Sequence, residues 1–105
     1  MTLQNILANA NMLAMETKIF KIIGNITRVK ILACLGESEK TVTELISNCC
    51  LSQSAVSQHL AYLRDEGVIF STKRGKYHIY KVADKRLSKI CKEILELFPN
   101  LIKCN

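Results

Sequence analysis

Apolar residues recur every three or four positions over the first third of the chain, which is the spacing of one buried helical face. One such run extends from about Leu3 to Ile22. A second extends from Ile26 to Leu35 and follows Asn25, a residue type that commonly caps a helix. The pattern therefore predicts two helices separated at Gly24.

Two shorter helices are predicted next, and each begins with a capping residue. Thr41-Val42-Thr43-Glu44 is a capping box, so a helix should run from Val42 to about Asn48. Ser52 is well suited to cap a following helix that continues to about Asp65. The link between them, Cys49-Cys50-Leu51, is too short for the helices to lie antiparallel easily, so they should cross steeply.

The pattern changes from helical to strand-like after Gly67. Val68–Thr72 and Tyr77–Val82 are rich in β-branched and aromatic residues, and they flank the glycine-containing link Lys73–Lys76. These segments predict a β-hairpin. From Asp84 to about Phe98 the spacing is helical again, with an apolar seam similar to that of a coiled coil, and Pro99 should end or kink this helix.

The expected fold is mainly α with a small β-hairpin, in the order α-α-α-α-β-β-α. Two short helices joined by a tight turn and followed by a hairpin form a winged helix-turn-helix, and residues 1–105 are the right length for one such domain. Hydrophobic residues make up 49% of the chain, more than one small core readily hides. We therefore expect a homodimer formed through the first and last helices.

Charge and cysteine content narrow the function. Fifteen Lys and Arg against nine Asp and Glu give a net charge of +6, a common footprint of nucleic-acid binding. Five cysteines at irregular spacing favour a reducing compartment over a secreted disulfide framework. Because no membrane or export segment is evident, we expect a cytoplasmic protein without a membrane partner.

No feature of the pattern predicts an enzyme. The chain lacks a phosphate-binding glycine loop, and neither His59 nor His78 has an evident paired nucleophile. We therefore expect no catalytic residue and no cofactor.

The fourth helix carries the polar residues expected to read DNA, because the second helix of such a pair enters the major groove. If Val56, Leu60 and Leu63 are buried, the opposite arc holds the base-reading candidates Gln53, Ser54, Ser57, Gln58 and Tyr62. A plain solvent-exposed face is the alternative. Phosphate contacts are expected from the hairpin tip and from basic residues near helix ends: Arg28, His59, Arg64, Lys73, Arg74 and Lys76.

Residues 51–64, LSQSAVSQHLAYLR, resemble the recognition helix of the ArsR/SmtB family of bacterial repressors. Thr27-Arg28 with Ile31-Leu32 resembles the opening of that family's second helix, and the wording is closest to the branch that includes BigR, SqrR, HlyU and NolR. The resemblance implies a homodimer that binds double-stranded DNA at a palindromic operator and represses transcription. It also implies that a chemical signal relieves the repression.

The same resemblance bears on that signal. Three members of that branch, BigR, SqrR and HlyU, sense sulfane sulfur or oxidants through one cysteine on the second helix and one on the last. The resemblance therefore implies a thiol switch between Cys34 and Cys104, with Cys91 in reserve. The family's metal sites are not matched. Thr41 and Thr43 stand where the arsenic-type site has cysteines, and Arg86 stands where the zinc-type site has a histidine, so no metal site is expected there.

Three alternatives stay open at this point. Cys34 and Cys91 could be small buried hydrophobes with no sensing role. The vicinal pair Cys49-Cys50 could bind arsenite or another soft metal. A winged helix could also act as a protein–protein adaptor that makes no DNA contacts.

Overall fold

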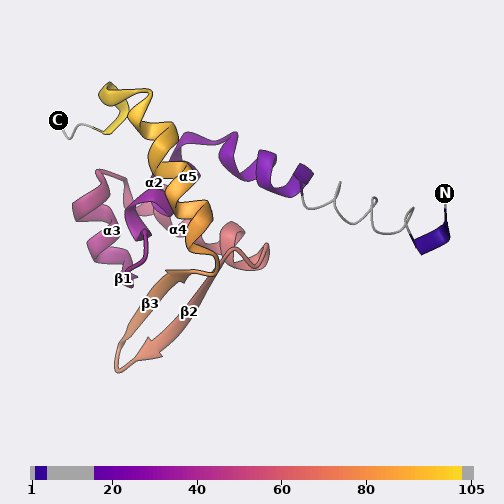
Figure 1. The fold of residues 1–105 in the computed structure, drawn as a ribbon. Helices are drawn as coiled ribbons and strands as arrows, with labels where there is room; N and C mark the ends of the chain where they lie inside the picture. The colour runs from indigo at the N-terminus through magenta and orange to yellow at the C-terminus, as the bar shows by residue number, and fades with distance from the viewer. Residues whose placement is uncertain (1, 5–15, 103–105) are drawn as a thin grey trace.

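A computed structural model describes residues 2–4 and 16–102 of the chain. Figure 1 shows a mostly helical body from which an antiparallel hairpin projects. After a helical segment at residues 16–23, the elements follow in this order: α2 (Ile26–Leu35), β1 (Lys40–Thr41), α3 (Val42–Cys49), α4 (Gln53–Asp65), β2 (Ile69–Arg74), β3 (Tyr77–Val82), α5 (Lys85–Glu96) and the 3₁₀ helix η1 (Pro99–Ile102). The expected winged helix-turn-helix is confirmed, and part of the predicted first helix, at residues 5–15, lies outside the described residues.

The predicted caps begin the helices. The Asn25 side chain accepts a hydrogen bond from the Arg28 amide at 3.1 Å. At α3 the amide of Glu44 donates to Thr41 Oγ1 at 3.2 Å, and Glu44 Oε1 accepts from the Thr41 amide at 3.1 Å, so both halves of the capping box are formed. Ser52 accepts from the Ala55 amide at 3.3 Å, which starts α4 where the sequence predicted.

A very short turn joins α3 to α4. Cys50 has φ 56° and ψ 45°, the left-handed conformation that ends many helices but that residues other than glycine seldom adopt. Leu51 and Ser52 follow it, and then α4 begins. The turn fixes the angle at which α4 leaves α3, and so it sets the direction of the outward face of α4.

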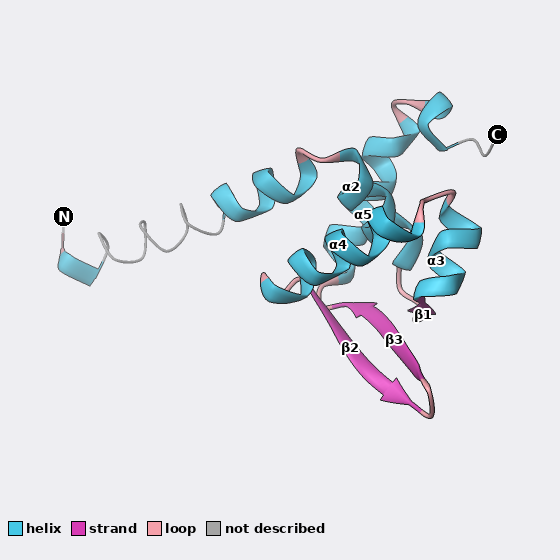
Figure 2. Cartoon of the chain, turned by 180° about the vertical axis from the view of Figure 1, so that it is seen from behind, coloured by secondary structure: helices cyan, strands magenta, loops and turns pink. Residues whose placement is uncertain are grey.

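The sheet contains one strand more than the sequence predicted. Its order is β1-β3-β2, and β1 pairs with β3 through Lys40↔Tyr80 and Thr41↔Ile79. Strand β2 is also longer than expected and reaches Arg74, which lies opposite Tyr77. The expected four-residue link is therefore a two-residue turn, and its first residue, Gly75, has the positive φ of 60° that such turns require. The hairpin consequently extends well beyond the helices (Figure 2).

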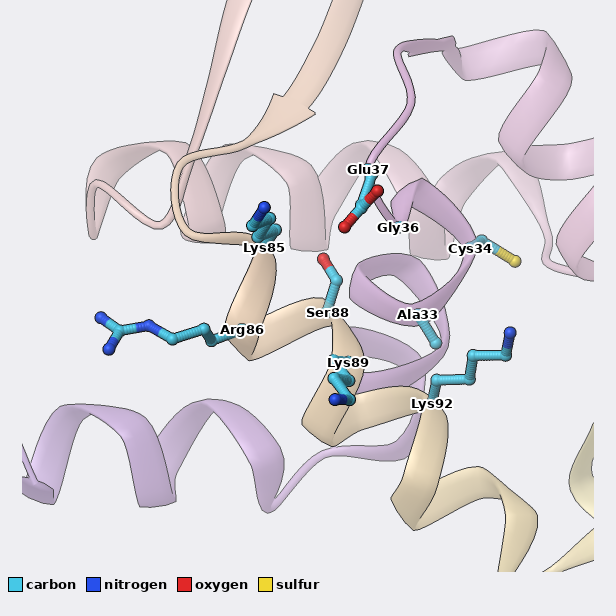
Figure 3. A pocket seen from close by; sticks show the side chains of 9 residues that line it. All are labelled: Ala33, Cys34, Gly36, Glu37, Lys85, Arg86, Ser88, Lys89 and Lys92. Atoms are coloured by element: carbon cyan, nitrogen blue, oxygen red, sulfur yellow. The ribbon is translucent and has the colours of Figure 1, made fainter.

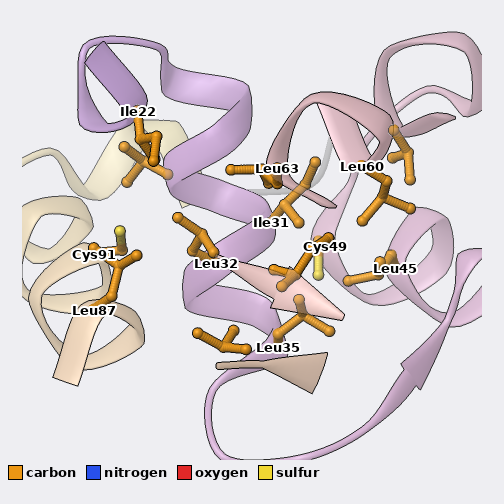
Figure 4. Close-up of a cluster of buried hydrophobic side chains, with 14 of the residues drawn as sticks. Ile22, Ile31, Leu32, Leu35, Leu45, Cys49, Leu60, Leu63, Leu87 and Cys91 are labelled. Carbon is orange, nitrogen blue, oxygen red and sulfur yellow. The ribbon is translucent and has the colours of Figure 1, made fainter. Parts of the chain in front are cut away.

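Helix α2 occupies the centre of the hydrophobic core. It packs against α3, α4 and α5, and its side chains Val29, Ile31, Leu32 and Leu35 are buried (Figure 4). The other elements supply the rest of the core: Ile22, Leu45, Cys49, Val56, Leu60, Leu63, Ile69, Val82, Leu87, Cys91 and Leu95. No helix among the described residues is long and apolar enough to span a membrane.

The seam expected on the last helix is only partly buried within one chain. Leu87 is 7% exposed, whereas Ile90 is 48% and Leu97 is 73% exposed. Phe20, on the helical segment at residues 16–23, is 68% exposed, and Phe98, just after α5, is 52% exposed. The helical segment and α5 therefore keep large apolar side chains at the surface, as a dimer interface would require.

Candidate nucleic-acid interface

The outward face of α4 is polar and nearly free of charge. Val56, Leu60 and Leu63 are buried beneath the helix. The opposite face exposes Gln53, Ser54, Ser57 and Gln58 together, as the helical period predicted. Such side chains can bond the edges of bases, since Gln suits adenine and Ser suits either a donor or an acceptor.

Ala61 was missed by the sequence reasoning. It is exposed and lies four residues after Ser57 and three after Gln58, so it shares their face of α4. A methyl group at this position lets the helix approach another surface closely and can contact a thymine methyl. The helical spacing of Ala61 could have placed it on this face, but alanine carries no hydrogen-bonding group that would indicate a DNA contact.

Tyr62 does not belong to this face. Its side chain is half-buried and packs against the core, and the Arg28 guanidinium lies over its ring at 4.3 Å from the centroid. The contact with Arg28 gives Tyr62 a packing role that the sequence did not predict. The expectation that its hydroxyl reads DNA stays a prediction.

Arg28 is likewise occupied inside the protein. Its Nη2 donates to the Lys21 carbonyl at 2.7 Å and its Nε donates to the Ile22 carbonyl at 3.3 Å. These carbonyls lie near the end of the helical segment at residues 16–23, where few amides of a next turn are available to donate to them. The Ile22 carbonyl also accepts a hydrogen bond from the Asn25 amide at 3.4 Å. Arg28 thus joins this segment to α2 and, through Tyr62, to α4, a role that the sequence did not predict.

His59 lies half-buried on α4, on the side facing Arg28 rather than the exposed polar face. Burial, and then the positive charge of Arg28, lower the pKa of His59 from its ordinary value. The lowered pKa favours the neutral imidazole, and this disfavours a charged contact between His59 and a phosphate.

The wing presents the basic residues expected of it. Lys73 is exposed near the end of β2, Lys76 is exposed in the turn between β2 and β3, and Arg64 is exposed in the last turn of α4. Arg74 instead forms a two-pronged ion pair with Glu39, with N–O distances of 3.0 Å and 3.3 Å. Glu39 precedes β1, so this pair ties the wing to the loop after α2. The distance of 35 residues along the chain hid it from sequence reasoning.

The cysteines pair differently from the expected switch. A disulfide joins Cys34 of α2 to Cys49 at the end of α3, with the two Cα atoms 6.0 Å apart. This corrects the assignment of Cys34 to Cys104 or Cys91, and Cys104 lies outside the described residues. The bond also removes Cys49 as a thiolate for arsenite, and no group of three metal-binding side chains occurs in the described part of the chain.

Cys91 is a free thiol that is completely buried on α5. Burial raises its pKa to about 11, so almost none of it is thiolate at neutral pH. Because the thiolate is the reactive form, Cys91 fits the alternative of a buried hydrophobe better than that of a sensor.

Comparison with known proteins places this geometry among transcription regulators. Residues 25–71, which include α2, α3 and α4, match the sequence profile of the family described as "Bacterial regulatory protein, arsR family". The chain is 36% identical over 83 residues to the transcriptional activator HlyU of Vibrio cholerae, covering 79% of this chain and 73% of that protein. It is also 36% identical over 67 residues to the arsenical resistance operon repressor of Escherichia coli, covering 63% and 57%.

A solved structure has the same overall architecture. The crystal structure of the transcriptional regulator HlyU from Vibrio vulnificus superimposes with a TM-score of 0.69 at 31% identity, covering 93% of this chain and 99% of that one. The match therefore spans the wing and α5 as well as the two helices of the helix-turn-helix.

Proposed function

Since the chain belongs to the arsR family of bacterial regulatory proteins, we propose that it is a homodimer that binds a palindromic DNA operator and represses transcription. The name of the E. coli relative supports repression, whereas the Vibrio cholerae relative is named as an activator. A repressor needs only to occupy its operator, which a small DNA-binding domain can do.

The observation that carries this proposal is the combination of an uncharged polar helix with a basic hairpin beside it. In the proposed complex Gln53, Ser54, Ser57 and Gln58 contact base edges in the major groove. Lys73 and Lys76 contact phosphates from the wing, and Arg64 does so from the end of α4. Polar side chains would thus choose the sequence while the lysines and arginine supply affinity.

Selection of a binding site from random duplexes, followed by anisotropy titrations, tests the proposal. We expect a selected palindrome to bind more tightly than random duplex. Affinity for both should fall by more than about tenfold when salt rises from about 50 to about 200 mM, because each phosphate contact releases counterions. A protein that shows no salt-dependent binding to any duplex would instead be a protein–protein adaptor built on this fold.

We further propose that thiol chemistry regulates operator binding through the Cys34–Cys49 pair. The bond joins α2 to the last residue of α3, directly before the turn that orients α4. In its oxidation two thiols give up two electrons and two protons to hydrogen peroxide, forming the disulfide and two water molecules. The disulfide then restricts the adjustment of α4 to the major groove, so the oxidised protein should bind its operator more weakly.

Operator titrations of the reduced and peroxide-treated protein test this regulation. The wild type should lose affinity on oxidation and regain it with a dithiol reductant. Cys34→Ser should bind equally well under both conditions, and Cys91→Ser should behave like the wild type. Equal affinity of the reduced and oxidised wild type would remove the switch but leave DNA binding intact.

A further inference from the structure

A groove of about 750 Å³ runs between the end of α2 and the side of α5 (Figure 3). The DNA surface described above does not use it. Side chains from both helices line it, mainly Ala33, Cys34, Lys85, Ser88, Lys89 and Lys92. Pockets of this size commonly hold small organic molecules.

The groove carries a row of positive charge. Lys85, Lys89 and Lys92 follow one another at helical spacing along one edge of α5, and no described carboxylate forms an ion pair with any of them. Glu37 is the acidic side chain on the rim. Arg86 is already bonded to Asp84 at 2.7 Å, so the lysines dominate the charge that a ligand would meet.

Ser88 supplies a hydrogen-bonding group without a partner. The residue is 3% exposed, and its Oγ makes no hydrogen bond. Burying a hydroxyl without a hydrogen-bond partner costs free energy. Binding of a ligand that carries a hydrogen-bond acceptor would remove this cost. In Figure 3 the hydroxyl points into the groove between Lys85 and Glu37, two exposed and long side chains that can move aside.

The groove should stay open in a dimer. The lysine row and the exposed apolar residues Ile90 and Leu97 lie on different edges of α5, because a helix turns by about 100° per residue. Subunits that meet through Ile90 and Leu97 would leave the lysine side uncovered. The groove also touches α2, which packs against both α3 and α4.

We propose that this groove binds a small amphipathic organic anion, namely a carboxylate with an apolar body. The carboxylate accepts a hydrogen bond from Ser88 Oγ and pairs with Lys85 and Lys89. The apolar body lies on Ala33 and on the methylene stems of Lys89 and Lys92. The site itself stands apart from DNA binding, and only its regulatory consequence, an altered position of α2, rests on the proposed function.

Titration of 2-naphthoate into the DNA-free protein, followed by backbone amide chemical shifts, tests the site. We expect saturable shifts around Ala33 and Ser88, and much weaker binding of the neutral 2-naphthalenemethanol and of inorganic phosphate. Ser88→Ala, which removes only the hydroxyl, should weaken 2-naphthoate at least about tenfold, since hydrogen bonds to charged groups are the strong ones. Lys89→Gln should weaken it as well.

Lys21→Gln is the matched control, because Lys21 is an exposed lysine on the helical segment at residues 16–23. It should bind 2-naphthoate as the wild type does. Binding that is absent, that survives both groove substitutions or that is equal for the neutral alcohol would overturn the proposal. These outcomes do not depend on DNA, so a protein that binds no operator but does bind the anion would refute only the proposed function.

Discussion

Gln58 and Lys76 lie on different parts of the candidate DNA surface, and replacing each by alanine should weaken DNA binding in a different way. Gln58→Ala should cost about 1–3 kcal/mol at the preferred base pair and relax the sequence choice there, because the amide can bond a base edge in two places. Lys76→Ala should weaken all duplexes alike and lower the salt slope by about one unit. Anisotropy titrations with the selected and a scrambled duplex measure both effects.

Lys92→Ala serves as the control for that pair, since it removes an exposed lysine of α5, which belongs to neither α4 nor the wing. If Gln58→Ala weakened the scrambled and selected duplexes equally, Gln58 would be a backbone contact rather than a base-reading residue.

Asp84 makes stability depend on pH in the acid range. Hydrogen bonds from the Arg86 side chain and then from its backbone amide lower the pKa of Asp84 to about 2. A carboxyl whose pKa is lower in the folded state stabilises the fold above its unfolded pKa, near 3.8, and loses that effect as pH falls toward 2. The melting temperature should therefore drop over this window, and it should drop less in Asp84→Asn than in the wild type.

The control is Asp65→Asn, which removes an exposed carboxyl at the end of α4 for which the structure gives no ion pair. It should retain the acid transition of the wild type. Identical pH profiles for Asp84→Asn and the wild type would show that Asp84 adds nothing to stability.

Some residues of the candidate site could be placed from the sequence, and others could not. The helical period alone predicts which α4 side chains are exposed, because it gives the direction of each side chain around the helix axis; these are Gln53, Ser54, Ser57 and Gln58. The period does not predict which neighbouring element packs against a given side chain. The contact between Arg28 and Tyr62 was missed for this reason, since the Arg28 side chain comes from another helix.

At the scale of elements, Arg28 joins three helices that meet near the start of α2. It bonds the Lys21 and Ile22 carbonyls and stacks on Tyr62 of α4. Arg28→Ala should lower the free energy of unfolding by about 2 kcal/mol, because two charge-assisted bonds and a cation–π contact are lost. Urea unfolding measures this loss.

Arg64→Ala is the matched control, as it removes an exposed arginine that makes no such contacts, and its effect should stay within about 0.5 kcal/mol. Arg28→Lys should fall between the two, since an ammonium keeps the charge but not the planar fork. Equal stability of Arg28→Ala and Arg64→Ala would refute the structural role.

The helices and the hairpin were predictable because their signals are local. Caps at Asn25, Thr41 and Ser52 mark three starts within one or two residues. Strand β1 carries no such signal, because its two residues become a strand only by pairing with β3, about 40 positions later. The Cys34–Cys49 bond is equally non-local, and spacing along the chain could not select it from the possible pairs.

At the scale of the whole molecule, the apolar residues left outside the core predict self-association. Ile90, Leu97 and Phe98 on and after α5 are each about half exposed or more. The double variant Ile90→Glu/Leu97→Glu should be monomeric at concentrations where the wild type is dimeric, because charges would enter the interface without partners. Sedimentation velocity measures the state, and operator affinity should fall with it, since one subunit holds only one half-site.

Phe70→Glu is the control for this prediction, as Phe70 is an exposed aromatic residue on the wing, 47% accessible, outside the expected interface. It should remain dimeric. A dimer that persisted in the double variant would place the interface elsewhere on the molecule.

The Arg74–Glu39 pair has a consequence for how such a protein searches a genome. An arginine already paired with a carboxylate at 3.0 Å must break that pair to contact a phosphate. The free energy gained on binding non-operator DNA is therefore smaller. DNA-binding proteins reach their operators by sliding and hopping along the duplex, and this search is faster when they dissociate quickly from non-operator sites. If the wing contacts DNA as proposed, Glu39 would shorten the time that the protein spends at each non-operator site, and the operator would be found sooner.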